Sequence, residues 1–396
     1  MCGEKGFACC TYLPCAAKCE IRAERCNPMT HKQRVLAAIR REPHDRLPFC
    51  SRIELWYNYH ANQGTLPHRY QGMSQWDLQR QLDIGLVGYY GAGEDLFRLQ
   101  YHNMNYREEL LPDRRVVTVE TPHGTIGAEW QVPRELKGSA SITIQTKHFF
   151  ESADDYPALQ HFIENTEPVE NYAGYAKLPE AIGDDGVALP FAGKVPIHML
   201  MEDYMGYEQF YYEWHDNREK LEALHRALWE QRLKVMGIAA GAPCEIVSVG
   251  GNYDEQMTPP PVFESHMIPF CQEACQILHA GGKLVAIHGD GEMRRLLELM
   301  PATGVDVVES ITPQPMTSIN MTKLRELWAD GPAIWGGLAA VIFTKTFSEG
   351  QFRRYVNELL EAMEGHDGFI LGFGDNVPTD AVFERVEDVA ELVRTM

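Results

Sequence analysis

The chain has 396 residues, a formal net charge of -20 and a hydrophobic fraction of 44%. This length suffices for one large α/β barrel with insertions or for two ordinary domains. The acidic balance, without any Lys- or Arg-rich run, argues against nucleic acid and anionic membranes as partners. No apolar stretch approaches the roughly 18 residues that a membrane span requires.

The first 26 residues contain six of the ten cysteines. Their spacings do not match a pair of zinc fingers, and no signal-peptide core is present. We predict that residues 1–28 are a poorly ordered extension, or upstream codons translated ahead of a true start at Met29. A small metal or disulfide cluster is the alternative. The scattered cysteines of the remaining chain predict a cytoplasmic protein.

The first 150 residues contain both helical and β patterns. Thr30 and Gln33 have the spacing of a capping box, so a helix is expected over residues 31–41. Strands are expected at 46–50 and, more weakly, at 83–88. Residues 115–120 and 125–130 flank a turn and predict a β-hairpin, and 141–145 could add a strand. We expect residues 100–150 to form an antiparallel insertion or lid.

After residue 190, strand and helix patterns alternate regularly. Strands are expected at 195–199, 244–250, 283–288, 305–309, 333–337 and 369–373. Helices are expected at 218–236, 261–279, 292–300, 321–328, 349–363 and 381–396. With the two earlier strands this makes eight strand–helix units, which predicts an α/β fold of the closed (β/α)8 TIM-barrel type. A doubly wound open sheet is the alternative, but no G-x-G-x-x-G follows the first strand.

Polar residues follow several of these strands, and in a barrel such positions gather on one face. His288 and Asp290 are candidates for catalysis and metal ligation, although Asp290 could instead cap the next helix. Glu309 and Asp375 are further candidate metal ligands, and Asp254 is a candidate catalytic residue. The candidate substrate-binding residues are Asn252, Tyr253, Trp335 and His198. His266, His279 and His366 fall in or beside helices, and we predict that they are not catalytic.

Three stretches resemble uroporphyrinogen decarboxylase-like proteins. They are MTHKQRVLAAI at 29–39 with PHDRLP at 43–48, the region from Gly250 through 283–291, and GDNVP at 374–378. The resemblance covers residues 29–396 and implies a TIM-type barrel. The Met-Arg-Gln-Ala-Gly-Arg run of the true decarboxylase is absent, since residues 49–54 read FCSRIE. This departure argues against decarboxylation of uroporphyrinogen.

The other branch of the superfamily comprises corrinoid-linked methyltransferases and O-demethylases, which bind zinc through a His-x-Cys pair and a distant Cys. His288 matches the His, Asp290 occupies the first Cys position, and Asp375 lies near the second. Cobalamin-independent methionine synthase, a related barrel, inserts a Glu between its ligands, and Glu309 falls at a comparable place. A ligand set of nitrogen and oxygen donors is harder than one with thiolates and suits polarisation of an oxygen atom.

The resemblance thus implies a zinc-dependent methyltransferase that moves a methyl group from a small oxygen-containing donor to a corrinoid protein. The corrinoid would be carried by a partner, because the chain has no Asp-x-His-x-x-Gly motif at a suitable place. A cofactor-free decarboxylase of another carboxylated substrate is one alternative, with His288 and Asp290 transferring protons. A non-catalytic binding protein is the other. A homodimer is expected by analogy with barrels of this type.

Overall fold

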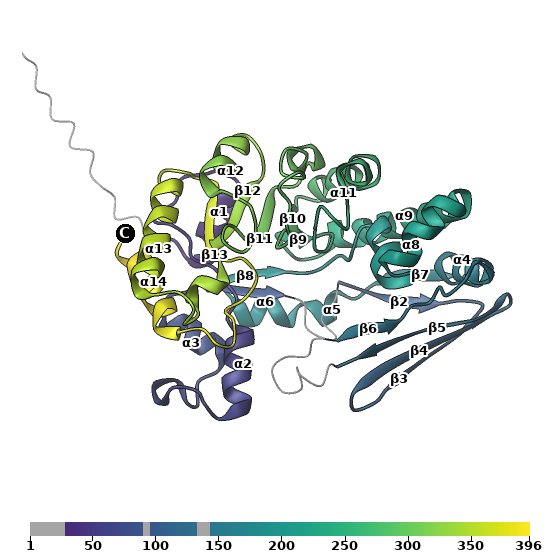
Figure 1. Cartoon of the computed structure of the whole chain (residues 1–396), viewed down its shortest axis with the longest axis horizontal. Coiled ribbons are helices and arrows are strands. Elements are labelled where there is room, and N and C mark those ends of the chain that lie inside the picture. The colour runs from purple at the N-terminus through teal and green to yellow at the C-terminus, as the bar shows by residue number, and fades with distance from the viewer. Residues whose placement is uncertain (1–27, 90–95, 133–142) are drawn as a thin grey trace, which may run out of the picture.

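The computed structural model describes residues 28–89, 96–132 and 143–396. Residues 1–27 of the expected extension and residues 141–142 of the additional strand lie outside these ranges. The described chain is an α/β protein in which parallel strands are covered by helices and an antiparallel unit lies to one side (Figure 1). No helix within the described ranges is both long and apolar enough to span a bilayer.

The main sheet has five parallel strands in the order β13-β12-β11-β10-β9. Their bounds are β9 Ile246–Ser248, β10 Leu284–His288, β11 Val307–Ile311, β12 Ala333–Leu338 and β13 Phe369–Phe373. A second parallel pair joins β1 (Leu86–Tyr89) to β8 (Gly186–Leu189). Isolated parallel bridges join Phe49 to Leu371, Cys50 to Gly85, and Phe191 to Ser248. The strand ends of both sheets therefore lie near one another.

Six helices follow or cover these strands: α1 His31–Ile39, α9 Arg218–Gly241, α11 Ile268–Ala280, α12 Met321–Leu327, α13 Glu349–Met363 and α14 Phe383–Thr395. Capping boxes begin α1 at Thr30 and α13 at Ser348, because each hydroxyl accepts a backbone N–H that the helix leaves unpaired. The other α-helices of the described ranges are α2 Glu54–Gln63, α3 Gln75–Gln81, α4 Tyr156–Glu164, α5 Tyr172–Tyr175, α6 Lys177–Ile182, α7 Pro196–His198, α8 Tyr207–Asp216 and α10 Pro260–Val262.

The antiparallel unit has two parts. One is the four-stranded sheet β3 Asn105–Leu110, β4 Arg114–Thr121, β5 Gly124–Gln131 and β6 Ile144–Lys147. The other is the pair β2 Phe97–Tyr101 and β7 Thr166–Glu170. The expected hairpin is present as β4 and β5, closed at the Thr121–Gly124 pair. Alternate residues Val117, Val119, Ile126 and Ala128 are buried, so this sheet packs one face on the rest of the protein (Figure 1).

Several of the expected elements differ from the structure. Residues 195–199 form α7 and then a π-helical turn, η4 (Met199–Tyr204), while the strand of this region is β8. A short apolar run cannot be assigned to strand or buried helix from periodicity alone. Residues 292–300 form a series of turns instead of a regular helix, and a second π-helical turn, η5 (Phe263–Met267), interrupts the helix expected at 261–279.

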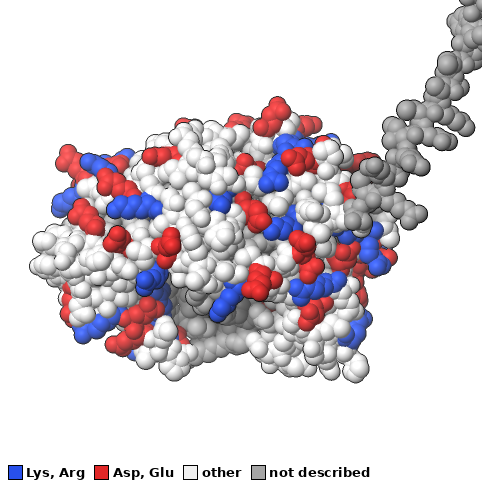
Figure 2. All heavy atoms as spheres, turned by 180° about the vertical axis from the view of Figure 1, so that it is seen from behind, with Lys and Arg blue, Asp and Glu red and all other residues white. Residues whose placement is uncertain are grey.

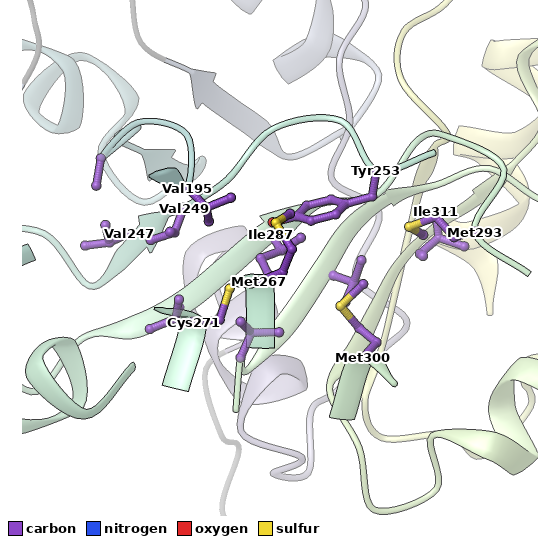
Figure 3. Packing of buried hydrophobic residues seen from close by; sticks show 14 of the residues in the cluster. Val195, Val247, Val249, Tyr253, Met267, Cys271, Ile287, Met293, Met300 and Ile311 are labelled. Carbon is purple, nitrogen blue, oxygen red and sulfur yellow. The ribbon is translucent and has the colours of Figure 1, made fainter. Parts of the chain in front are cut away.

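The core contains two groups of side chains. The smaller group joins residues of α1 to one face of the strands: Val35, Ala38, Ile39, Cys50, Val187, Leu189, Ile246, Ala286, Val307, Ala333, Trp335 and Ile370. The larger group fills the space between the strands and the covering helices, and Figure 3 shows part of it around Tyr253, Ile287 and Met293. Basic and acidic side chains are interspersed over the face in Figure 2, as expected for an acidic protein without a basic patch.

Candidate functional site

A cavity of about 870 Å³ lies at the carboxyl ends of the parallel strands. Its lining comes from segments far apart in the sequence: Arg52, Glu54, Gln75, Trp76, Val87, Gly88, Phe191, Lys194, Glu202, Tyr207, Gly250, Gly251, Asn252, His288, Asp290 and Asp375. This position is where parallel α/β folds place their binding sites. Four of the predicted site residues, His288, Asp290, Asp375 and Asn252, are in this lining.

His288 is held by the carboxylate of Glu309 on the neighbouring strand. The parallel register of β10 and β11 places these two residues side by side, and His288 Nδ1 lies 2.5 Å from Glu309 Oε1. The Ser310 hydroxyl donates to the other oxygen, Oε2, at 2.7 Å. Glu309 is only 3% exposed, so both of its oxygens are engaged away from bulk water. The carboxylate therefore orients the imidazole, with Nε2 on the side of Asp290.

Asp290 lies on the cavity side of the same imidazole. Its Oδ2 is 3.6 Å from His288 Nε2, beyond a hydrogen bond but close enough for strong electrostatic coupling. Burial by itself lowers the pKa of His288, but the Glu309 carboxylate and Asp290 raise it to about 10. The pair therefore offers a proton, or a nitrogen and an oxygen donor, to whatever occupies the cavity.

Backbone geometry at two positions makes this arrangement possible. Ser310 has a φ of +63°, which is uncommon for a residue other than glycine, and the pairing of β11 with β12 is irregular between Val308 and Ile311. Gly291 allows the loop after β10 to approach Tyr253 closely, because a Cβ there would lie 2.1 Å from the Tyr253 carbonyl oxygen. Irregular strand ends of this kind often occur beside functional sites.

Asp375 lines the same cavity together with Arg52. Arg52 Nη1 donates to Asp375 Oδ1 at 3.1 Å, and its Nε donates to Glu54 Oε1 at 2.5 Å. The guanidinium thus joins the segment after the bridged residues Phe49 and Cys50 to the loop after β13. Asp375 therefore lies in the same cavity as His288, with Arg52 as its present partner.

Lys194 forms a second charged group in the lining. Its Nζ lies 2.8 Å from Glu202 Oε2 and 2.6 Å from Asp203 Oδ1, both on η4. Burial lowers the pKa of Lys194, but the two carboxylates more than compensate and raise it above its ordinary value. The Tyr207 hydroxyl donates to Glu202 Oε1 at 2.8 Å. This network connects the cavity to the antiparallel unit, because Gln145 of β6 donates to the Asp203 carbonyl.

The remaining predicted residues lie behind or beside the cavity. His198 is fully buried on α7, with Nε2 2.8 Å from Thr258 Oγ1. Tyr253 is fully buried next to it and packs in the hydrophobic core (Figure 3). Asp254 accepts the Gln256 N–H in a turn. Trp335 lies in the core, where its indole N–H donates to the Cys50 carbonyl at 2.8 Å.

Sequence reasoning did not assign Arg52, Glu54, Lys194, Glu202 or Tyr207 to the site. Arg52 and Glu54 follow the strand expected at 46–50. This position after a strand was the signal that could have identified them as site residues. Lys194 follows the true strand β8, which the wrong strand at 195–199 concealed.

His198 should make the stability of the protein depend on pH. Burial lowers its pKa from 6.5 to about 4, an effect that Glu202 opposes and Lys194 reinforces. As the pH falls, the His198 imidazole is protonated in the unfolded chain before it is protonated in the folded protein. The contribution of the neutral, buried His198 to the free energy of unfolding is therefore fully present above pH 6.5 and is lost as the pH falls towards 4. We expect this effect of His198 to lower the free energy of unfolding by about 2 kcal/mol between pH 7 and pH 5. Urea unfolding at both pH values should show a smaller loss of unfolding free energy in His198→Gln than in the wild type. An equal loss in the two proteins would contradict this prediction.

Comparisons with known proteins agree with this architecture. The model of the uroporphyrinogen decarboxylase (URO-D) family matches residues 197–396, just over half of the chain. A methyltransferase from Methanosarcina mazei has a similar solved structure, with a TM-score of 0.56 and 15% identity over 93% of this chain and 99% of that chain. At this identity the likeness bears on the fold. A comparison with curated protein sequences gave no match. The chain belongs to the uroporphyrinogen decarboxylase family.

Proposed function

We propose that this protein is a zinc-dependent methyltransferase that moves a methyl group from a small oxygen-containing donor to a corrinoid protein, as the demethylase component of such a system. The observation that carries the proposal is the His288 imidazole. Its Nδ1 is held by Glu309, and its Nε2 faces Asp290 at the wall of the cavity. A carboxylate that binds the far nitrogen of a metal-ligating histidine is a recurrent feature of zinc sites.

The proposed fold is a closed (β/α)8 barrel, with residues 100–150 as an insertion or lid. The five-stranded sheet, the β1–β8 pair and the three isolated bridges together link eight strand segments in a ring, from residues 49–50 through β1, β8 and β9 to β13. The smaller core group, drawn from these strands and α1, would fill the interior. In such a barrel the cavity lies at the mouth formed by the strand carboxyl ends.

The residues present fit a zinc ion in part. His288 Nε2 and Asp290 Oδ2 supply one nitrogen and one oxygen donor at a separation close to that of two ligands on one ion. Asp375 would be the third protein ligand once released from Arg52, while Glu309 would position His288 without binding the metal. The ion would act as a Lewis acid on the donor oxygen. The chain's own residues would bind and orient the substrate, with Asn252 and Tyr207 as polar contacts.

The cavity also supports the alternative of a cofactor-free decarboxylase. Arg52 and Lys194 are two cations in its lining, and cations of this kind can hold substrate carboxylates. His288 would then donate the proton that replaces the departing carboxyl group, with Asp290 close to its Nε2. This mechanism needs neither zinc nor a corrinoid.

One experiment separates the two functions. The purified full-length protein is stripped with a chelator, reloaded with zinc and incubated with free cob(I)alamin and a panel of small methyl ethers, methylamines and methyl esters. Formation of methylcobalamin is followed by its absorption spectrum. We expect zinc-dependent methylation with oxygen-containing donors, and no methylation with any donor would contradict the proposal. Release of CO₂ from carboxylated substrates by the stripped protein would establish the decarboxylase instead.

A further inference from the structure

A second group of metal-binding side chains lies away from the cavity. Within the described ranges, Glu222, His225 and His266 are a set of three in which one donor atom from each residue lies within 4.8 Å of the others. Glu222 and His225 are one turn apart on α9, and His266 is in η5, the π-helical turn that precedes α11. Residues three apart on a helix share a face, so α9 presents both side chains to η5.

The distances suit a single ion after a small contraction. His266 Nε2 lies 3.3 Å from Glu222 Oε1, and His225 Nδ1 lies 3.8 Å from Glu222 Oε2. Two ligands of a tetrahedral zinc ion are about 3.3 Å apart, given zinc–nitrogen and zinc–oxygen bonds of about 2.0–2.1 Å. The first contact is a long hydrogen bond that an ion would replace, and the second is beyond hydrogen-bond range.

The environment holds the two imidazoles in place. The Ser265 hydroxyl lies 2.7 Å from His266 Nδ1, which leaves Nε2 directed towards Glu222. His225 is only 7% exposed, with Nδ1 on the side of Glu222. Trp214 and Trp229 pack edge-on against His266 and His225 and restrict their rotation.

Arg218 already binds the Glu222 carboxylate. Its Nε donates to Oε1 at 2.7 Å, and its guanidinium lies over the Trp214 ring. This cation opposes the binding of another positive charge. The three residues line a cavity of about 520 Å³, and two further carboxylates, Glu230 and Glu273, are in the same lining. The cavity provides room for a water molecule as the fourth ligand.

We propose that Glu222, His225 and His266 form a second site for a divalent transition-metal ion, zinc by preference, which joins α9 to η5. Two imidazoles and one carboxylate suit zinc better than magnesium or calcium, which prefer sets of oxygen ligands. The three residues do not line the cavity that contains His288. This site is therefore independent of the proposed methyl transfer, and its role would be to stabilise the packing of the two helices.

The full-length protein is stripped of metal and dialysed to equilibrium against zinc, and the bound zinc is measured by elemental analysis. We expect the His225→Gln/His266→Gln variant to bind one zinc ion fewer than the wild type. The His288→Ala/Asp290→Asn variant should keep this ion, so the proposal for this site and the proposal for the His288 site can be contradicted independently. His215→Gln, which replaces an exposed histidine on α8, serves as the matched control and should bind as the wild type does. Equal zinc content and affinity in the wild type and the double Gln variant would overturn the proposal.

A spectroscopic measurement distinguishes this site from the cysteine-rich extension. Cobalt(II) bound by nitrogen and oxygen ligands gives visible d–d bands without the intense near-ultraviolet band of a thiolate complex. In the His288→Ala/Asp290→Asn background, those bands should disappear when His225→Gln/His266→Gln is added and remain when His215→Gln is added. If the double variant does not fold, Glu222→Gln is used in its place, with an expected loss of at least about 10-fold in zinc affinity. Unchanged affinity in a folded Glu222→Gln protein would also contradict the site.

Discussion

Replacing His288 by alanine should reduce kcat/KM for methyl transfer by about a thousand-fold or more, because the imidazole is the main nitrogen donor or proton donor of the cavity. Glu309→Gln should have a smaller effect, a loss of about 10- to 100-fold, because the amide still fills the space but orients the ring less firmly. We therefore expect kcat/KM to be lower in His288→Ala than in Glu309→Gln, and lower in both than in the wild type. These values are measured with the cob(I)alamin assay, at substrate concentrations that give kcat and KM separately.

His279→Ala is the matched control for this series. His279 is at the end of α11 and pairs with Asp306, next to the amino end of β11 and away from the cavity. Its activity should stay within about two-fold of the wild type. An equal loss in His279→Ala and His288→Ala would indicate a general defect in folding. A folded His288→Ala protein with wild-type activity would exclude His288 from the reaction.

Replacing Lys194 by methionine should destabilise the protein by about 3 kcal/mol, because it leaves the carboxylates of Glu202 and Asp203 without their cation in a partly buried place. Burial already raises the pKa of Asp203 in the wild type, where Lys194 opposes that rise. Without the lysine, the folded-state pKa of Asp203 should rise further above the unfolded value. The stability deficit should therefore narrow as the pH falls from 7 to 5.

Urea unfolding of three variants tests the role of Lys194. Lys194→Arg keeps the charge and should lose much less stability than Lys194→Met. The double variant Lys194→Met/Asp203→Asn removes one of the unpaired charges, so we expect it to recover part of the loss. A Lys194→Met protein with wild-type stability would show that the two carboxylates are neutralised by other means. A double variant less stable than Lys194→Met would show that Asp203 has a favourable partner besides the lysine.

Much of the secondary structure followed from local sequence patterns. The helix over residues 349–363 has the same bounds in the structure, because Ser348 caps its first turn and its apolar residues recur at helical spacing. The apolar runs within 283–288 and 369–373 are strands with polar residues at or just after their ends, as expected. Where two short apolar segments competed, at 186–189 and 195–199, local pattern favoured the wrong one, because only the parallel pairing with β1 distinguishes them.

The sequence by itself determined the family, the α/β class and the presence of polar residues after β10, β11 and β13, because these depend on residue type and on spacing along the chain. Only the tertiary structure decided what those residues do. The register of β10 and β11 places Glu309 beside His288, so that its carboxylate contacts the imidazole. Contacts between distant segments bring Arg52 to Asp375, and His266 to Glu222 and His225. Such partners are separated by tens to hundreds of residues, so no local pattern specifies them.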